Sequence, residues 1–192
     1  MVTAKTQFTK EQIIAAAFDI ARAEGLESIT VRKVAEKMGS SIAPIYVNFQ
    51  HIDELVQAVV QKTFDVAQRL LAEQDSGNPF FDIGVASLRF ADEYSQLFRD
   101  LILKPNQYMQ NYDQEMGPIL LEQMKKDQEL AGFTDQELLE ILLKMRIFQL
   151  GLSVMVANRL LPKDFDEEKT IKLLNGTGAD VIAGTRLRKN QG

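Results

Sequence analysis

Residues 24–49, which read EGLESITVRKVAEKMGSSIAPIYVNF, decide the fold of the N-terminal part of this chain. They hold two short amphipathic segments with a glycine between them. Thr30 is expected to cap a helix over 31–38, because a threonine hydroxyl accepts a hydrogen bond from a free backbone N–H of the first turn. Gly39 ends that helix, since glycine readily takes the left-handed conformation past a helix C-terminus. The stretch therefore predicts a helix, a tight turn and a second helix.

A proline locates the start of the second helix. Proline has no backbone N–H, so a helix tolerates it only in the first turn, where donors lack an intrahelical partner. With Ser41 as the N-cap, Pro44 falls at the third helical position. We therefore expect the turn at 38–40 and the second helix at 42–49.

The rest of the chain shows helical periodicity and no strand-like alternation of apolar and polar residues. Thr9 and Gln12 form a capping box at the start of a first helix that ends at Gly25. Further helices are expected at 52–73, 80–93, 95–102, 107–127, 135–160 and 166–188. The predicted fold is all-α, with an N-terminal three-helix domain over 1–52 and a C-terminal helical domain over 53–192. The helix at 52–73 is expected to connect the two domains.

Composition limits the classes of function. The 192 residues include no cysteine and one histidine, which argues against disulfides and against cysteine or histidine metal sites. No nucleophile–base pair and no phosphate-binding glycine loop is recognisable, so we expect no catalytic residues and no enzyme. The polar N-terminus and the absence of long apolar stretches predict a cytoplasmic protein. The net charge is −5, whereas residues 1–52 carry +1, which permits DNA binding there.

Two short helices joined by a glycine turn are the minimum of a helix-turn-helix, whose second helix enters the major groove of DNA. The residues resemble those of the TetR family of bacterial transcriptional regulators: QIIAAAFDIA at 12–21, EGLESITVRKVA at 24–35, MGSS at 38–41, PIYVNF at 44–49 and DEL at 53–55. The resemblance covers residues 8–56. It implies a homodimeric repressor that binds a palindromic operator and is released by a small apolar or aromatic effector. The effector would bind within 80–160 and change the spacing of the two recognition helices.

The resemblance also implies which residues contact DNA. The segment 41–44 would lie nearest the base edges, and its apolar side chains suit thymine methyls. Tyr46 and the Thr30 hydroxyl would hold phosphates, with charge from Arg32 or Lys33; such contacts mainly fix the register. The predicted DNA-binding residues are Thr30, Arg32, Lys33, Ser40, Ser41, Ile42, Ala43, Pro44, Tyr46, Asn48 and His51.

Ile52 departs from the family pattern, which usually has a phosphate-binding lysine at the start of the fourth helix. One phosphate contact per subunit would then be missing. His51 replaces it when protonated, or is an exposed histidine without such a role.

The last two predicted helices carry glycines among apolar residues. A glycine in a helix interior costs roughly 1 kcal/mol relative to alanine, so Gly178 and Gly184 indicate close helix packing, either between subunits or inside one. The resembled family forms its dimer from these two helices. The predicted dimer interface is Leu152, Met155, Val156, Gly178, Val181, Ile182 and Thr185.

Bulky side chains between the connecting helix and the dimer helices form a candidate effector pocket or, alternatively, the core of the domain. Methionine fills adaptable cavities and is equally at home in a core, so only the family resemblance implies a pocket. Its predicted residues are Phe90, Tyr94, Phe98, Met109, Tyr112, Met116, Met124, Phe148 and Leu152.

Other functions stay open at this point. A helical carrier or enzyme without DNA binding is one alternative. A family member that activates transcription, or that responds to a protein partner, is another.

Overall fold

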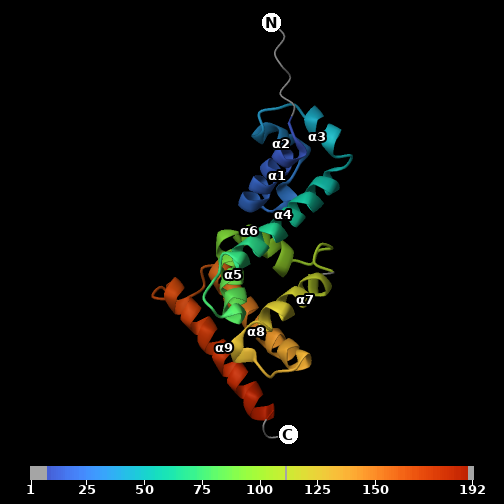
Figure 1. Ribbon diagram of the computed structural model, residues 1–192. Coiled ribbons are helices and arrows are strands. Elements are labelled where there is room, and N and C mark those ends of the chain that lie inside the picture. Colours follow the sequence, from blue (N-terminus) through green and yellow to red (C-terminus); the bar gives the residue numbers. More distant parts are fainter. Residues whose placement is uncertain (1–7, 111, 190–192) are drawn as a thin grey trace. The chain divides into compact units, whose positions relative to one another are not determined.

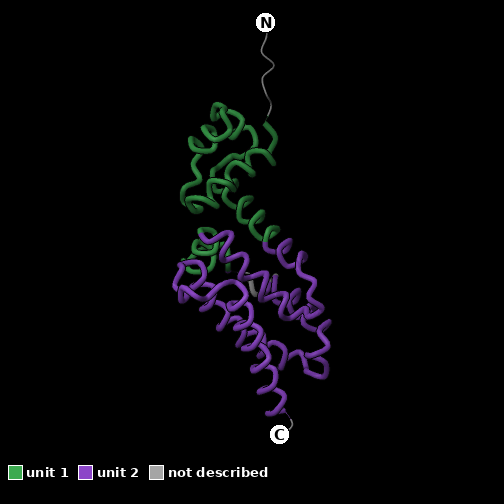
Figure 2. Tube along the Cα trace, turned by 90° about the vertical axis from the view of Figure 1, so that its left-hand side faces the viewer, with its two compact units in different colours: residues 1–66, 96–109 green, residues 67–95, 110–192 purple. Residues whose placement is uncertain are grey.

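The computed structural model describes residues 8–110 and 112–189, and the regular secondary structure in this part of the chain is helical (Figure 1). The chain divides into two compact units (Figure 2). Unit 1 comprises residues 1–66 and 96–109, and unit 2 comprises 67–95 and 110–192. The all-α fold is as the sequence predicts. The predicted boundary at residue 52 separates two functions. The two units are defined only by how compactly the chain packs, so they do not test that boundary.

Unit 1 begins with three helices and a short connecting turn: α1 (Lys10–Glu24), η1 (Leu26–Ser28), α2 (Val31–Lys37) and α3 (Ala43–Asn48). The first part of α4 (Ile52–Ala72) follows. The unit also contains most of α6 (Ser95–Phe98) and a π-helical turn, η2 (Arg99–Leu103). Sequence analysis assigned these last residues to the C-terminal domain.

Local capping explains why α1 and α2 start where they do. Thr9 and Gln12 form the expected capping box at α1, and Gly25 ends the helix with φ at 95°. The Thr30 hydroxyl accepts a hydrogen bond from the Lys33 N–H at the start of α2. Both caps confirm the predictions, because each needs only residues within three positions of one another.

The start of α3 differs from the prediction. Ile42, not Ser41, is the N-cap; the helix begins at Ala43 and Pro44 occupies its first turn. The Ile42 carbonyl accepts the first helical hydrogen bond, from the Ile45 N–H at 3.1 Å. No side chain caps this helix. The proline therefore marked the first turn correctly, but the predicted cap was wrong by one residue.

Unit 2 consists of the end of α4 together with α5 (Pro79–Glu93), α7 (Tyr112–Met124), η3 (Gln128–Leu130), α8 (Asp135–Ala157) and α9 (Glu167–Lys189). The helix predicted at 107–127 is too long, because 107–110 form turns and α7 is described only from Tyr112. Residue 111 lies outside the described residues.

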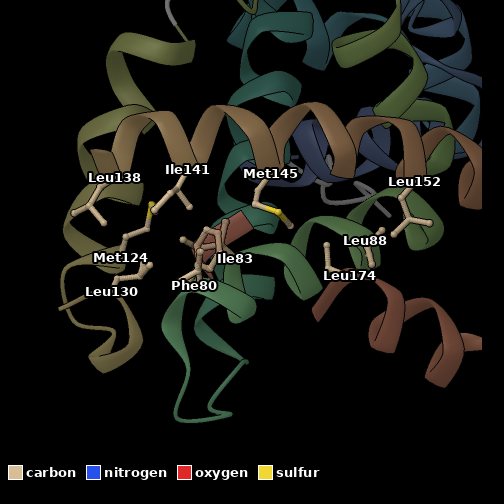
Figure 3. Close-up of a cluster of buried hydrophobic side chains, with 11 residues drawn as sticks. Phe80, Ile83, Leu88, Met124, Leu130, Leu138, Ile141, Met145, Leu152 and Leu174 are labelled. Carbon is tan, nitrogen blue, oxygen red and sulfur yellow. The ribbon is translucent and has the colours of Figure 1, made fainter. Parts of the chain in front are cut away.

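The core of unit 2 forms where α5 packs against α8 and α9 (Figure 3). Two glycines allow this close approach. A Cβ on Gly84 would lie 2.8 Å from Leu174 Cδ2, and a Cβ on Gly178 would lie 2.7 Å from Phe81 Cε1. Gly178 therefore packs against a helix of its own subunit. This is the second of the two explanations that the sequence left open for the glycines of this helix.

Candidate nucleic-acid interface

Helix α3 presents an apolar face outside the core of unit 1. Its inward side chain, Ile45, and the following Phe49 are buried. Because 3.6 residues make one turn, the opposite face is left exposed. Ile42, Tyr46 and Val47 are 50%, 57% and 82% exposed. An exposed apolar face on a short helix after a tight turn suits contact with thymine methyls and sugars in a major groove.

Val47 is the residue that sequence analysis missed. It lies one helical turn after Ala43, so the two share a face of α3. The signal was present in the sequence, because placing Ile45 and Phe49 in the core puts Val47 on the outward side. In the sequence, Val47 stands only within the family motif at 44–49.

The predicted phosphate contacts differ in their availability. Arg32 is exposed and has no hydrogen-bond or ion-pair partner among the described residues. Lys33 instead pairs with Glu24, with 2.6 Å between Nζ and Oε2. The Thr30 hydroxyl accepts from the Lys33 N–H, which leaves its own hydrogen free to donate. These contacts favour Arg32 over Lys33 as the source of charge beside Thr30.

Two polar side chains of the turn and α3 bond to the nearby backbone. The Ser40 hydroxyl donates to the Ser41 carbonyl at 3.0 Å, and Asn48 Nδ2 donates to the Pro44 carbonyl at 2.8 Å. The carbonyl oxygen of the Asn48 amide remains available as an acceptor. Ser41 and Ala43 are exposed and Pro44 is half-buried.

The entry to α4 shows how Ile52 is placed. Ile52 is half-buried at the first position of the helix, and His51 beside it is exposed. Glu54 occupies the helix entry as well, because its carboxylate accepts from the Gln50 N–H at 3.0 Å. Lys10 lies over the Phe49 ring, 5.1 Å from its centroid, and adds a cation near the end of α3.

Residues 13–59 match the sequence model of the family described as "Bacterial regulatory proteins, tetR family". The matched segment runs from α1 through the helix-turn-helix into α4. Over these residues the chain is similar to the TetR family of bacterial regulatory proteins.

One curated relative agrees with this similarity. An uncharacterised HTH-type transcriptional regulator from Haemophilus influenzae is 25% identical over 136 residues, which are 70% of this chain and 62% of the relative. The match thus spans less than two thirds of that relative's length. The description of that relative is of a transcriptional regulator and not of an enzyme.

Solved structures share the fold. A transcriptional regulator from Rhodococcus sp. Rha1 gives a TM-score of 0.68 at 20% identity, covering 92% of this chain and 97% of its own. A TetR-like regulator from Rhodococcus sp. RHA1 gives 0.66 at 18% identity, covering 96% and 100%. TetR from Acinetobacter baumannii AYE gives 0.54 at 18% identity, covering 94% and 98%.

The predicted effector-pocket residues are distributed over both units. Phe98 and Met109 belong to unit 1, and Phe90, Tyr94, Met116, Met124, Phe148 and Leu152 belong to unit 2. The Phe90 and Tyr94 rings stack with centroids 5.7 Å apart. Met124 and Leu152 are part of the buried core, and Phe148 packs against it. The Tyr112 side chain lies outside the part of the structure that is described.

Unit 2 contains a cavity of about 500 Å³ between α5, the end of α8 and the start of α9. Apolar side chains such as Leu88, Val156 and Phe165 line it together with charged ones. Arg159, whose φ of 56° is left-handed, pairs there with Asp92 at 3.0 Å. Of the predicted effector residues described in the structure, none lines this cavity.

The predicted dimer residues are mostly inside the subunit. Leu152, Gly178, Ile182 and Thr185 are buried, Val156 and Val181 are half-buried, and Met155 is exposed. Among the described residues, no group of three or more acidic or histidine side chains could hold a metal ion. In the same part of the chain, no helix is long and apolar enough to cross a membrane.

Proposed function

We propose that this TetR-family chain is a transcriptional repressor that binds a palindromic operator as a homodimer and leaves it when a small molecule binds. The exposed apolar face of α3, formed by Ile42, Ala43, Tyr46 and Val47, is the observation that carries the DNA-binding part. These side chains contribute little to the core, and they lie on the second helix of a helix-turn-helix inside the family match. DNA binding in a bacterium also implies the expected cytoplasmic location.

Few base contacts per subunit favour a dimer. Because α3 offers mainly apolar side chains to the bases, one subunit would discriminate weakly. Two half-sites related by a two-fold axis add their binding free energies and require a fixed spacing. A palindromic operator follows from that symmetry.

An exposed apolar stripe on α8 supports a dimer surface different from the one predicted. Its members are spaced by three or four residues, which places them on one face of the helix. They are Leu139, Leu143, Ile147, Leu150 and Val154, all exposed except the half-buried Val154. Contiguous exposed apolar surface of this kind marks interaction sites. We place a second copy of the chain on this α8 stripe.

The outward face of α9 suits the same interface. Leu173 and Leu187 are exposed there, with Gly176, Ala179 and Ala183 between them. A Cβ on Gly176 would meet no atom within 4 Å, so this glycine is free to approach a partner helix. Most of the predicted interface residues of α8 and α9 pack inside the subunit. We therefore propose that the exposed faces of the same two helices contact the second subunit.

The effector would bind in unit 2. The cavity of about 500 Å³ falls in the usual range for small-ligand sites. Because apolar side chains line it together with Arg89, Asp92 and Arg159, it suits an amphipathic molecule better than a purely apolar one. This refines the apolar or aromatic class expected from the sequence.

Selection from a random double-stranded DNA library tests the proposal. The purified protein should enrich a palindromic sequence, and fluorescence polarisation should show that binding to it weakens steeply with salt. Failure to enrich any sequence, with and without a library of small metabolites present, would contradict the DNA-binding role and would favour a carrier. Reporter expression from the selected operator then separates a repressor from an activator.

A further inference from the structure

A segment from the C-terminal part of the sequence completes the DNA-binding unit. Residues 96–109 belong to unit 1, although the chain on either side of them belongs to unit 2. Leu97, Phe98 and Leu101 of this segment are buried. The segment therefore packs as part of the unit that carries α2 and α3, and its polar contacts decide what it does there.

Asp100 makes the most specific of these contacts. Its Oδ2 accepts a hydrogen bond from the Leu26 N–H at 2.7 Å, across 74 positions of sequence. The bond is buried, and the Asp100 side chain is 10% exposed. A carboxylate that accepts from a backbone N–H makes a charge-assisted bond, about twice as strong as a neutral one.

The corner between α1 and α2 is shaped around this carboxylate. Gly25 has φ at 95°, and a Cβ on it would lie 2.6 Å from Asp100 Oδ2. Only glycine meets both requirements. After Gly25, η1 is closed by the Ser28 N–H to Gly25 and the Ile29 N–H to Leu26, each at 3.1 Å. Thr30, the N-cap of α2, follows directly.

Asp100 is itself held firmly. It lies in the π-helical turn η2, and such turns are rare and often found at functional sites. Its second oxygen, Oδ1, pairs with Lys104 Nζ at 2.7 Å, which raises the pKa of Lys104 above its ordinary value. Asn106 Nδ2 donates to the carbonyls of Asp100 and Leu101 at 3.1 and 2.9 Å. Both carboxylate oxygens are thus fixed in direction.

We infer that Asp100 is a positioning residue for DNA binding: it holds the Gly25–Leu26 corner and so sets the place of the Thr30 hydroxyl at the start of α2. The inference rests on the proposed DNA-binding function and adds a residue far in sequence from the helix-turn-helix. Residues 96–109 are joined to unit 2 at both ends, and the Asp100 hydrogen bond links them to Leu26, four residues before Thr30.

The test compares two buried carboxylates that both accept backbone hydrogen bonds. Asp100→Ala removes the bond to Leu26. Asp127→Ala is the matched control, because Asp127 accepts from the Phe80 and Glu129 N–H groups at 3.1 and 2.8 Å inside unit 2. Lys104→Met removes the ion pair but keeps the Leu26 bond. Each full-length variant is measured by hydrogen exchange, thermal unfolding and polarisation on the operator selected by the wild-type protein.

Asp100→Ala should increase amide exchange at Leu26 and weaken operator binding by about tenfold at a temperature where the variant is still folded. Asp127→Ala should lower the melting temperature yet bind the operator within about twofold of wild type. Lys104→Met should keep the protection of Leu26 and bind within about threefold. If Asp100→Ala fails to fold, Asp100→Asn, which keeps an acceptor oxygen without the charge, replaces it and should weaken binding by about threefold.

A double-mutant cycle separates positioning from general stability. Thr30→Val removes the hydroxyl that Asp100 is inferred to position. If Asp100 acts through Thr30, Asp100→Ala should cost less than about twofold in the Thr30→Val background. Fully additive losses, or wild-type affinity in Asp100→Ala with Leu26 exchange increased, would overturn the inference while DNA binding itself stands. A wild-type protein that selects no DNA would overturn both.

Discussion

On α3, single residues differ sharply in what they do for the fold. Ile45 and Phe49 are buried in unit 1, whereas Val47 is 82% exposed and belongs to no core. A valine on the surface costs little by itself and brings no stability to the subunit. We therefore expect Val47 to contact DNA. A substitution there should change the affinity for the operator without changing the stability of the fold.

Val47→Glu should weaken operator binding by about tenfold or more, because a carboxylate on the reading face repels phosphates. Its melting temperature should stay at the wild-type value. Leu160→Glu is the matched control, since Leu160 is also exposed and the charge change is the same. Polarisation at constant salt measures the effect; equal affinities of the two variants would show that α3 does not read DNA.

Ile52 offers a gain-of-contact experiment. A lysine at the start of α4 should add one phosphate contact per subunit. Ile52→Lys should therefore tighten binding at low salt and steepen the log–log salt dependence by about 0.9 per subunit. An unchanged slope in Ile52→Lys would mean that no phosphate lies near this helix end.

Arg32→Ala should flatten the same log–log salt dependence by about the same amount. Titrations between 50 and 200 mM salt, roughly the range where such slopes are clear, measure the slopes of both variants.

At the scale of elements, helix ends were predictable where a cap is local. The box at Thr9 and the Thr30 cap need only residues three positions apart, so the sequence was sufficient. The start of α3 was not, because the competing caps at Ser41 and Ile42 differ by one residue and Pro44 falls in the first turn with either of them. The π-helical turn after α6 also had no sequence signal, since its Asp100 side chain accepts a hydrogen bond from the Leu26 N–H, 74 positions away.

The α8 stripe yields a prediction about assembly. Leu143→Glu should place an unpaired charge in the proposed interface and raise the dimer dissociation constant by at least about a hundredfold. Helix content should be unchanged, because Leu143 is exposed within the subunit. Sedimentation equilibrium measures the state. Glu140→Gln, which lies on α8 beside the stripe, should remain as dimeric as the wild type; a Leu143→Glu dimer of wild-type strength would place the interface elsewhere.

Two glycines on α9 make a matched pair for helix packing. Gly178→Ala should destabilise unit 2 by about 1–3 kcal/mol, because its new Cβ would meet the Phe81 ring. Gly176→Ala should stabilise by up to about 1 kcal/mol, because no atom lies within 4 Å of its Cβ and alanine favours a helix. Both are made in the Leu143→Glu background, so that subunit contacts do not contribute. Urea unfolding gives the free energies, and equal values for the two variants would contradict the packing described.

At the scale of the whole molecule, the proposal requires an effector in unit 2 and DNA at unit 1. A thermal-shift screen of amphipathic small molecules should find compounds that raise the melting temperature and weaken operator binding, since a ligand changes an equilibrium only by its differential affinity. Ile171→Trp, which fills the cavity from α9, should abolish both effects. A compound that still acts on this variant binds outside the cavity, and the residues predicted from the sequence, such as Phe90 and Tyr94, are then the next site to test.

The sequence by itself determined the helical class, the similarity of the N-terminal segment to the TetR family and most helix boundaries, and it predicts the segment that would face DNA. These depend on periodicity, caps and a motif, all of which are written in neighbouring residues. Only the tertiary structure decided which sides of α8 and α9 are buried and that residues 96–109 complete unit 1. Such features arise from contacts between residues far apart in sequence, such as Gly178 with Phe81 and Leu26 with Asp100. No local pattern encodes these contacts, because the residues next to each partner in the sequence are compatible with its local structure whether or not the distant partner is present.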